Sequence, residues 1–243
     1  EFNALVHPGR NGYLWTLERQ ADRIGFVDAE PYVYQNAFSS IDPETGRPTY
    51  DPEHTPATGE SVDFCPSLWG GKDWPPAAYN PDTGLVYIPV NENHCGVIEG
   101  REVTYMPGSS YTGARTEFTL REPEGNIGEI QAWNMNTGEE VWSVEFQSHN
   151  WGGILTTGGN LIFSGGTSDR YFRAHDASSG EELWRFRTNS GIIGVPSTFS
   201  VDGKQYVAVQ SGWGVDAAGM TARIDQQRGT RTFVPQGGVV WVF

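Results

Sequence analysis

The sequence predicts an all-β fold made of repeated four-stranded antiparallel units. Three observations indicate this: a turn motif recurs along the chain, short β-branched and aromatic runs surround its copies, and amphipathic helical patterns are nearly absent. The 243 residues include 31 glycines and 15 prolines, which fits short strands alternating with turns. With 37% hydrophobic and 13% aromatic residues, the chain can bury a sizeable core.

The turn motif has two strong copies and two weaker ones. Ala132–Trp142 reads AWNMNTGEEVW and Ala174–Trp184 reads AHDASSGEELW, and their starts lie 42 residues apart (174 minus 132). Weaker copies occupy Ser40–Tyr50 and Thr16–Phe26. We expect an acidic or amide side chain to cap each turn, a Gly to reverse the chain, and the terminal aromatic to pack over a neighbouring unit. A period near 40 to 45 residues is typical of a four-stranded β-propeller blade.

Runs rich in β-branched and aromatic residues predict strands between the motif copies. They are Ala4–Val6, Gly84–Val90, Asn160–Ser164, Gln205–Gln210 and Gly238–Phe243. Two segments break the period, at about 51–76 and 96–128. We expect these insertions to project from one face of the fold, where such folds place their sites.

Charge and cysteine content exclude several classes of protein. The net charge of −14 and a pI near 4.7 argue against nucleic acid as a partner, because a phosphate-binding surface needs clustered Lys and Arg. The acidic surface either attracts a basic protein or confers solubility. The two cysteines, Cys65 and Cys95, exclude a Cys-x-x-Cys site and a covalently attached haem c in this segment. They form either a disulfide, as in an exported protein, or two free thiols.

The repeated pattern resembles the tryptophan-docking motif of the pyrroloquinoline-quinone (PQQ) dependent alcohol dehydrogenases, the methanol and ethanol dehydrogenase group. More specific landmarks occur in that family's order across essentially the whole chain. They are VHPGRNGY from Val6, CPSLWGGKDW from Cys65, NWGG from Asn150 and GWG from Gly212. The resemblance implies that residues 1–243 are C-terminal blades of an eight-bladed β-propeller, with the two insertions described above.

The resemblance assigns cofactor-binding roles to four residues. Arg10 matches an arginine that reaches the ortho-quinone carbonyl oxygens of PQQ, where a cation stabilises the charge that develops on hydride uptake. Asp73 stands where the family often has an Asn that hydrogen-bonds the quinone; an ionised carboxylate only accepts, so Asp73 pairs instead with Lys72 or Arg10. Trp74 is expected to line the pocket, and Trp151 matches a tryptophan that packs beside the cofactor.

Other features of the family are matched only in part. Cys65 and Cys95 correspond to a disulfide found in part of the family. The Ca²⁺ or lanthanide ligands, the catalytic base and the tryptophan that stacks on PQQ are expected upstream of this chain, so neither a catalytic nor a metal-binding residue is assigned within it. His7 and His149 are expected to be structural hydrogen-bond donors.

The resemblance implies oxidation of a small primary alcohol, or of an aldehyde hydrate, by hydride transfer to PQQ, with electrons passed to a c-type cytochrome. It also implies a periplasmic location, with the N-terminal blades of the same enzyme as partner, and a chain that is inactive alone. A non-catalytic propeller scaffold for protein binding is an alternative. A carbohydrate-binding all-β module, suggested by nine tryptophans, is another. Arg10, Trp151 and Lys72-Asp73-Trp74 discriminate, because a scaffold has no need of an arginine aimed at a central channel.

Overall fold

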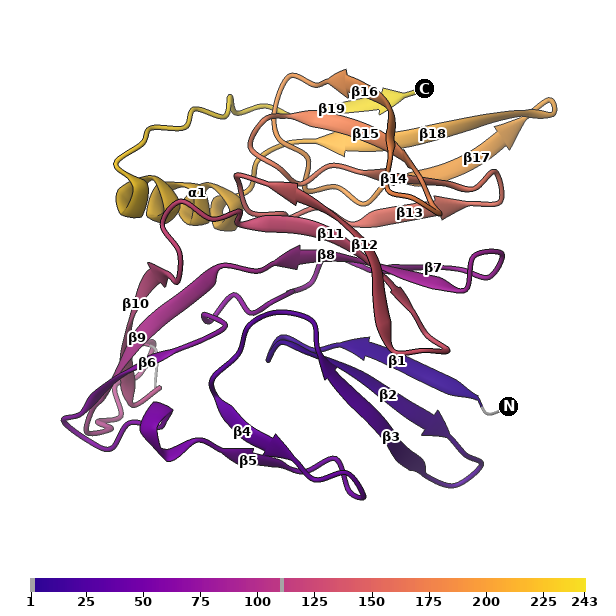
Figure 1. Ribbon diagram of the computed structural model, residues 1–243. Coiled ribbons are helices and arrows are strands. Elements are labelled where there is room, and N and C mark those ends of the chain that lie inside the picture. Colours follow the sequence, from indigo (N-terminus) through magenta and orange to yellow (C-terminus); the bar gives the residue numbers. More distant parts are fainter. Residues whose placement is uncertain (1–2, 110–111) are drawn as a thin grey trace. The chain divides into compact units, whose positions relative to one another are not determined.

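The computed structural model describes residues 3–109 and 112–243, and in this part of the chain nearly all regular structure is β (Figure 1). The residues divide into two compact units. The first unit contains residues 3–73 and 92–122, and the second contains residues 74–91 and 123–243. Each unit is described by itself.

The first unit holds three antiparallel sheets. The strands are β1 (Ala4–Pro8), β2 (Tyr13–Arg19) and β3 (Ile24–Pro31) in one sheet, β4 (Phe38–Ile41) and β5 (Pro48–Tyr50) in a hairpin, and β6 (Ser61–Phe64), β9 (His94–Gly100) and β10 (Ala114–Leu120) in the third, with a 3-10 helix η1 at Pro52–His54. Strand β9 is central in the third sheet. That sheet therefore joins strands from the two segments that break the sequence period.

The second unit holds two four-stranded antiparallel sheets and one of three strands. The first sheet has β7 (Ala78–Asn80), β8 (Leu85–Asn91), β11 (Gly128–Asn134) and β12 (Glu139–Phe146); the second has β13 (Ile154–Thr157), β14 (Leu161–Ser164), β15 (Tyr171–Asp176) and β16 (Glu182–Arg187); the third has β17 (Ser197–Val201), β18 (Lys204–Ser211) and β19 (Val239–Val242). The expected four-stranded antiparallel units are confirmed, and each of the five runs expected to be strands overlaps one.

Three copies of the turn motif fold alike. In the copy at 174–184, Asp176 Oδ1 accepts hydrogen bonds from the backbone N–H groups of Ser178 and Ser179 at 2.9 and 3.0 Å, and Gly180 N–H donates to Asp176 O at 2.9 Å. The turns that begin at Asp42 and Asn134 repeat this last bond. Their glycines and Gly180 lie at φ of 69°, 70° and 75°, in the left-handed region that favours glycine.

The fourth copy, Thr16–Phe26, does not form this turn. Its Glu18, at the position of the capping residue, lies within β2 instead, and the chain reverses through a hydrogen bond from Gln20 N–H to Arg23 O at 3.0 Å. Its terminal aromatic nevertheless behaves as the motif predicts, because Phe26 packs against Gly46 in the following turn.

The terminal tryptophan of one sheet contacts the turn of the next. Trp142, at the end of the first sheet's motif, donates its Nε1–H to Ala177 O at 3.2 Å. Its ring covers Gly180, where an added Cβ would lie 2.6 Å from Trp142 Cε3. Real Cβ atoms do not approach a ring this closely. Glycine is therefore needed at position 180 both to let the Trp142 ring pack against the turn and to adopt the positive φ. The motif is therefore a device that joins successive sheets.

Apolar side chains fill the spaces between the sheets of the second unit. Between its first and second sheets the buried cluster consists of Leu85, Tyr87, Ile130, Ala132, Ile154, Ile162 and Ala177. A second cluster, between the second and third sheets, consists of Phe172, Ile192, Val207 and Val209, with Trp241 and Phe243 packed against it. The three sheets thus lie beside one another in chain order (Figure 1).

One α-helix, α1 (Val215–Arg228), interrupts the third sheet between β18 and β19. Its buried residues are Ala217, Met220, Thr221 and Ile224, which have helical spacing but include a threonine and a small alanine. This weak apolar stripe explains why the sequence suggests so little helix. Gly229, at φ 65°, ends the helix by donating its N–H to Asp225 O.

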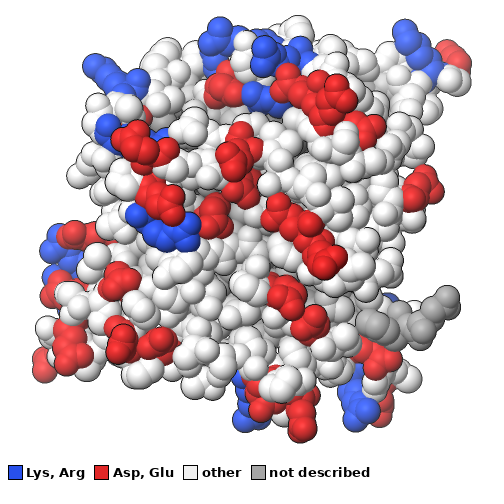
Figure 2. Space-filling model, in the orientation of Figure 1, with Lys and Arg blue, Asp and Glu red and all other residues white. Residues whose placement is uncertain are grey.

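Carboxylate side chains are scattered among neutral ones over the face of the molecule in Figure 2, in keeping with the net charge of −14. Across residues 3–109 and 112–243, no helix has the length and apolar character needed to cross a bilayer.

Candidate functional site

Arg10 lies on a tight turn between β1 and β2 in the first unit. Gly9 N–H donates to Tyr13 O at 2.8 Å, and Gly12 N–H donates to Gly9 O at 3.1 Å. The buried hydroxyl of Tyr32 donates to Gly9 O at 2.8 Å. The main chain that carries Arg10 is therefore fixed on both sides, while the Arg10 side chain remains 55% exposed.

The loop between β6 and β7 packs directly on this turn through Gly70 and Gly71. Gly71 N–H donates to Arg10 O at 3.2 Å. Gly70 has φ 73°, and a Cβ there would overlap the Arg10 backbone; at Gly71 it would lie 2.6 Å from Val33. Gly70 is therefore required by the close approach of the loop to the turn, and Gly71 by its close approach to Val33.

Asp73 completes the contact between the loop and Arg10. Its Oδ2 lies 3.0 Å from Arg10 Nη2, and its carbonyl oxygen accepts a hydrogen bond from Lys72 Nζ at 2.8 Å. Burial lowers the pKa of Lys72, while the Asp73 carboxylate acts in the opposite direction. Of the two partners expected for the Asp73 carboxylate, Arg10 forms the ion pair, and Lys72 binds the main chain instead.

A disulfide lies at the start of the same loop. Cys65 and Cys95 are bonded, with Cα atoms 4.4 Å apart, so the expected pairing is confirmed. Arg10 and the disulfide border a shallow hollow of about 580 Å³, within the usual volume range of small-molecule sites. Its lining residues are Arg10, Asn11, Ala37, Phe64, Cys65, Pro66, Ser67 and Leu68.

Trp74 and Trp151 meet in the second unit. Their rings are perpendicular, with centroids 6.4 Å apart, an edge-to-face geometry favoured by aromatic pairs. Trp151 is buried, and its backbone N–H donates to Gly166 O at 2.9 Å. Trp74 is half exposed, so the pair presents one open indole supported by one fixed indole.

A second aromatic pair in this unit, His149 and Trp213, is not signalled by the sequence. The two rings lie 5.2 Å apart with an interplanar angle of 30°. Both ring nitrogens of His149 and Nε1 of Trp213 are buried, and none of them has a hydrogen-bond partner among the described residues. Burial lowers the pKa of His149 to about 3, so the ring stays neutral at physiological pH. The expectation that His149 is a structural hydrogen-bond donor is therefore wrong, because it acts as a buried ring that packs on an indole.

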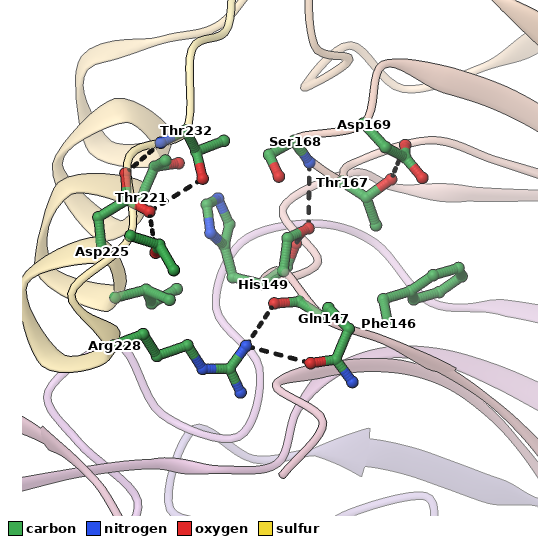
Figure 3. A pocket seen from close by; sticks show the side chains of 13 residues that line it. Phe146, Gln147, His149, Thr167, Ser168, Asp169, Thr221, Asp225, Arg228 and Thr232 are labelled. Atoms are coloured by element: carbon green, nitrogen blue, oxygen red, sulfur yellow. Dashed lines mark hydrogen bonds between the residues drawn. The ribbon is translucent and has the colours of Figure 1, made fainter. Parts of the chain in front are cut away.

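A pocket of about 300 Å³ in the second unit lies between α1 and two loops that follow strands β12 and β14 (Figure 3). Its charged side chains are already paired. Asp169 pairs with Arg173, Asp225 accepts hydrogen bonds from the Thr232 backbone and side chain at 2.7 and 2.9 Å, and Arg228 donates to Gln147 O at 3.0 Å. Of these groups, Arg228 anchors α1 to the segment that follows β12; because all of the charges are already paired, a structural role is favoured over a catalytic one.

The structure brings the residues of the expected site together in two pairs, Arg10 with Asp73 and Trp74 with Trp151. The pairs belong to different compact units, although Asp73 and Trp74 are consecutive in the chain. Within the described residues, no group of three or more His, Cys, Asp or Glu side chains is arranged to hold a metal ion.

Comparison with known proteins identifies the family. A family model described as the glucose/ethanol/alcohol dehydrogenase β-propeller domain, of the PQQ type, matches residues 113–207. The quinoprotein ethanol dehydrogenase of Pseudomonas putida is 37% identical over 261 residues, covering 100% of this chain and 39% of the relative. This chain belongs to the PQQ-dependent alcohol dehydrogenase family.

Further relatives and solved structures agree with this assignment. The lanthanide-dependent methanol dehydrogenase of Methylacidiphilum fumariolicum is 40% identical over 86% of this chain and 34% of the relative. The structure of a europium-containing methanol dehydrogenase matches 100% of this chain and 45% of its own, with a TM-score of 0.85 and 35% identity. The quinohemoprotein alcohol dehydrogenase of Comamonas testosteroni matches 98% of this chain and 35% of its own, with a TM-score of 0.78 and 30% identity.

Two conclusions follow from these matches. The sheets are blades of a β-propeller, as the repeat period predicts. The chain spans about two fifths of the length of the curated relatives it matches, and it corresponds to their C-terminal part.

Proposed function

We propose that this chain forms the C-terminal part of a periplasmic PQQ-dependent dehydrogenase. The enzyme oxidises small primary alcohols, or aldehyde hydrates, and passes the electrons to a c-type cytochrome. When bound, PQQ supplies an ortho-quinone that accepts hydride. The roles of this chain are to bind and orient that cofactor through Arg10, Asp73, Trp74 and Trp151.

The observation that carries the proposal is that the main chain of Arg10 is held in place while part of its guanidinium remains free to bind a ligand. Its main chain is fixed by the Gly71 and Tyr32 contacts, and one guanidinium nitrogen, Nη2, is paired with Asp73. Within residues 3–109 and 112–243 the structure gives the other guanidinium nitrogens no partner, so they are available to quinone oxygens. Fixed donors at a site of developing negative charge stabilise that charge without reorganising. The donors and the hollow of about 580 Å³ fit a planar anionic quinone.

Trp74 and Trp151 supply apolar ring surface. The indole of Trp151 is held by burial, and its backbone N–H bonds to Gly166 O. Trp74 packs perpendicular to this indole while remaining half exposed. We propose that both indoles border the ring system of the cofactor and keep water away from it. Packing a planar ligand against the exposed part of the Trp74 indole is favourable, because aromatic rings bury large apolar areas when they stack.

The remaining machinery is proposed to come from sequence upstream of this chain. Alcohol oxidation of this kind needs a base within hydrogen-bond reach of the hydroxyl and a metal ion, Ca²⁺ or a lanthanide, at the quinone. The ligands for that ion and the base are assigned to the N-terminal blades. The relatives, which are more than twice as long as this chain, support this division.

The proposal is tested by comparing residues 1–243 with an upstream-extended protein, which is lengthened at the N-terminal end to the length of the curated relatives. Dye reduction is measured with ethanol, PQQ and either Ca²⁺ or a lanthanide. We expect turnover only by the extended protein. Robust turnover by residues 1–243 alone would show that the base and metal site have been placed wrongly.

The role of Arg10 is tested in the extended protein by Arg10→Gln and Arg10→Lys. Both variants should bind PQQ more weakly and turn over more slowly, with Lys retaining more because it keeps the charge. Arg115→Gln is a matched control, because Arg115 is 59% exposed and pairs with Glu117 at 3.0 Å, much as Arg10 pairs with Asp73. Equal PQQ affinity in the Arg10→Gln and Arg115→Gln proteins would reject the role of Arg10.

A further inference from the structure

We propose that Asp73 is a positioning residue that orients the Arg10 guanidinium and offsets its positive charge. Asp73 thereby weakens the binding of anionic PQQ, and lowers its reduction potential, relative to an uncharged amide at the same place. The inference rests on the proposed function, because it requires that Arg10 faces the cofactor. It assigns the carboxylate an action through Arg10 in place of a direct hydrogen bond to the quinone.

Orientation follows from two contacts that reach Arg10 from one short loop. Gly71 N–H holds the Arg10 carbonyl oxygen at 3.2 Å, and Asp73 Oδ2 holds Nη2 at 3.0 Å. Asp73 itself is steadied by Lys72 Nζ on its carbonyl oxygen. The main chain and the side chain of Arg10 are thus both held by residues of the same loop. The direction of the guanidinium therefore depends on Asp73.

A direct bond from Asp73 to the quinone is excluded by its chemistry. An ionised carboxylate has no hydrogen to donate, and a quinone carbonyl oxygen can only accept. An amide at this position can donate, and it can also accept from Arg10. Replacement of Asp73 by Asn therefore preserves the contact to Arg10 while it removes one negative charge.

The effect of that charge is set by the groups around it. Arg10 and Lys72 contribute two positive charges and Asp73 one negative charge, so an Asn would raise the local net charge from +1 to +2. The side chains of Arg10 and Asp73 are 55% and 25% exposed, so solvent screens the interaction strongly. For a ligand several ångströms away in such surroundings, one unit of charge changes binding by roughly two- to tenfold.

The experiment uses the upstream-extended protein and the variants Asp73→Asn and Asp73→Ala, with Asp22→Asn as control. Asp22 is an exposed residue between β2 and β3, and its replacement changes the net charge equally. PQQ affinity is measured by fluorescence titration, and the reduction potential of bound PQQ by spectroelectrochemistry. Asp73→Asn should bind PQQ about two- to tenfold more tightly than the parent, with a higher potential. Asp73→Ala should bind more weakly than Asp73→Asn, because Arg10 has lost its anchor.

The comparison is repeated in an Arg10→Gln background, where the difference between Asp73→Asn and Asp73→Ala should shrink to the direct hydrogen bond that the Asn amide can donate to the quinone. If Asp73→Asn matches Asp22→Asn in affinity and potential, the charge role is refuted. If Asp73→Ala and Asp73→Asn already agree when Arg10 is present, the positioning role is refuted. Loss of PQQ affinity in Arg10→Gln combined with either result would leave the proposed function standing while the inference about Asp73 fails. No change in Arg10→Gln would reject both.

Discussion

Replacement of Gly180 by Ala should destabilise the protein far more than the same replacement in an open turn. At Gly180 the new Cβ would meet the Trp142 ring at 2.6 to 3.1 Å, and the backbone is at φ 75°. A left-handed backbone costs a non-glycine residue about 1–2 kcal/mol, and overpacking adds about 1–3 kcal/mol. We therefore expect a loss of about 2–5 kcal/mol in the free energy of unfolding.

Gly203→Ala is the matched control for this substitution. Gly203 has nearly the same φ, 76°, but its Cβ would meet nothing within 4 Å, so only the backbone cost of about 1–2 kcal/mol should appear. The assay is urea denaturation of the upstream-extended protein, with unchanged slopes required for comparison. If the two variants lose the same free energy of unfolding to within about 0.5 kcal/mol, the view that Trp142 needs a glycine beneath it is refuted. A difference of that size is what an ordinary surface substitution produces.

Three further predictions concern the disulfide, the Trp142 hydrogen bond and the buried His149. Removing the disulfide with Cys65→Ser and Cys95→Ser together should cost about 3–4 kcal/mol in urea denaturation, because the bridge closes a loop of 30 residues; an unchanged midpoint would contradict this. Trp142→Phe should cost only about 1 kcal/mol, because Ala177 O keeps a hydrogen bond from the Tyr87 hydroxyl at 3.0 Å; a loss above about 3 kcal/mol would contradict it. The buried His149 has a pKa of about 3 against an ordinary 6.5, so its contribution to stability is complete above pH 6.5 and falls by up to about 1.4 kcal/mol per pH unit toward pH 3. His149→Phe should flatten that dependence in denaturation series between pH 4 and 7, and parallel curves for the two proteins would contradict the assignment.

Local chemistry made the repeated turns predictable. At Asp42, Asn134 and Asp176 the capping side chain and the glycine lie within five residues of each other, so each turn is determined by neighbours in the sequence. Thr16–Phe26 matched the motif only loosely, and its Glu18 remained in β2. A long flexible Glu caps turns poorly compared with Asp or Asn, which explains the failure of this copy.

Contacts between distant segments were less predictable. The sequence suggested either Lys72 or Arg10 as the partner of Asp73, and only the approach of residues 70–73 to the Arg10 turn decides between them. The Gly-Gly pair at Gly70 was visible in the sequence, but its neighbour was not. A glycine makes room for a distant segment, here the Arg10 turn, and that segment leaves no pattern near the glycine in the sequence. For the same reason the packing of His149 on Trp213 could not be anticipated.

Helix α1 is held on the second unit by its buried face and, at its C-terminal end, by Arg228. The guanidinium donates to Pro123 O at 2.7 Å and to Gln147 O at 3.0 Å, and also binds Gly125 O. These three acceptors are main-chain carbonyls, which every residue type provides, whereas a fourth bond goes to the side-chain oxygen of Gln147 at 3.2 Å. The loops beneath the helix are therefore free to change their side chains during evolution without releasing it, provided that their backbone course and the single arginine persist.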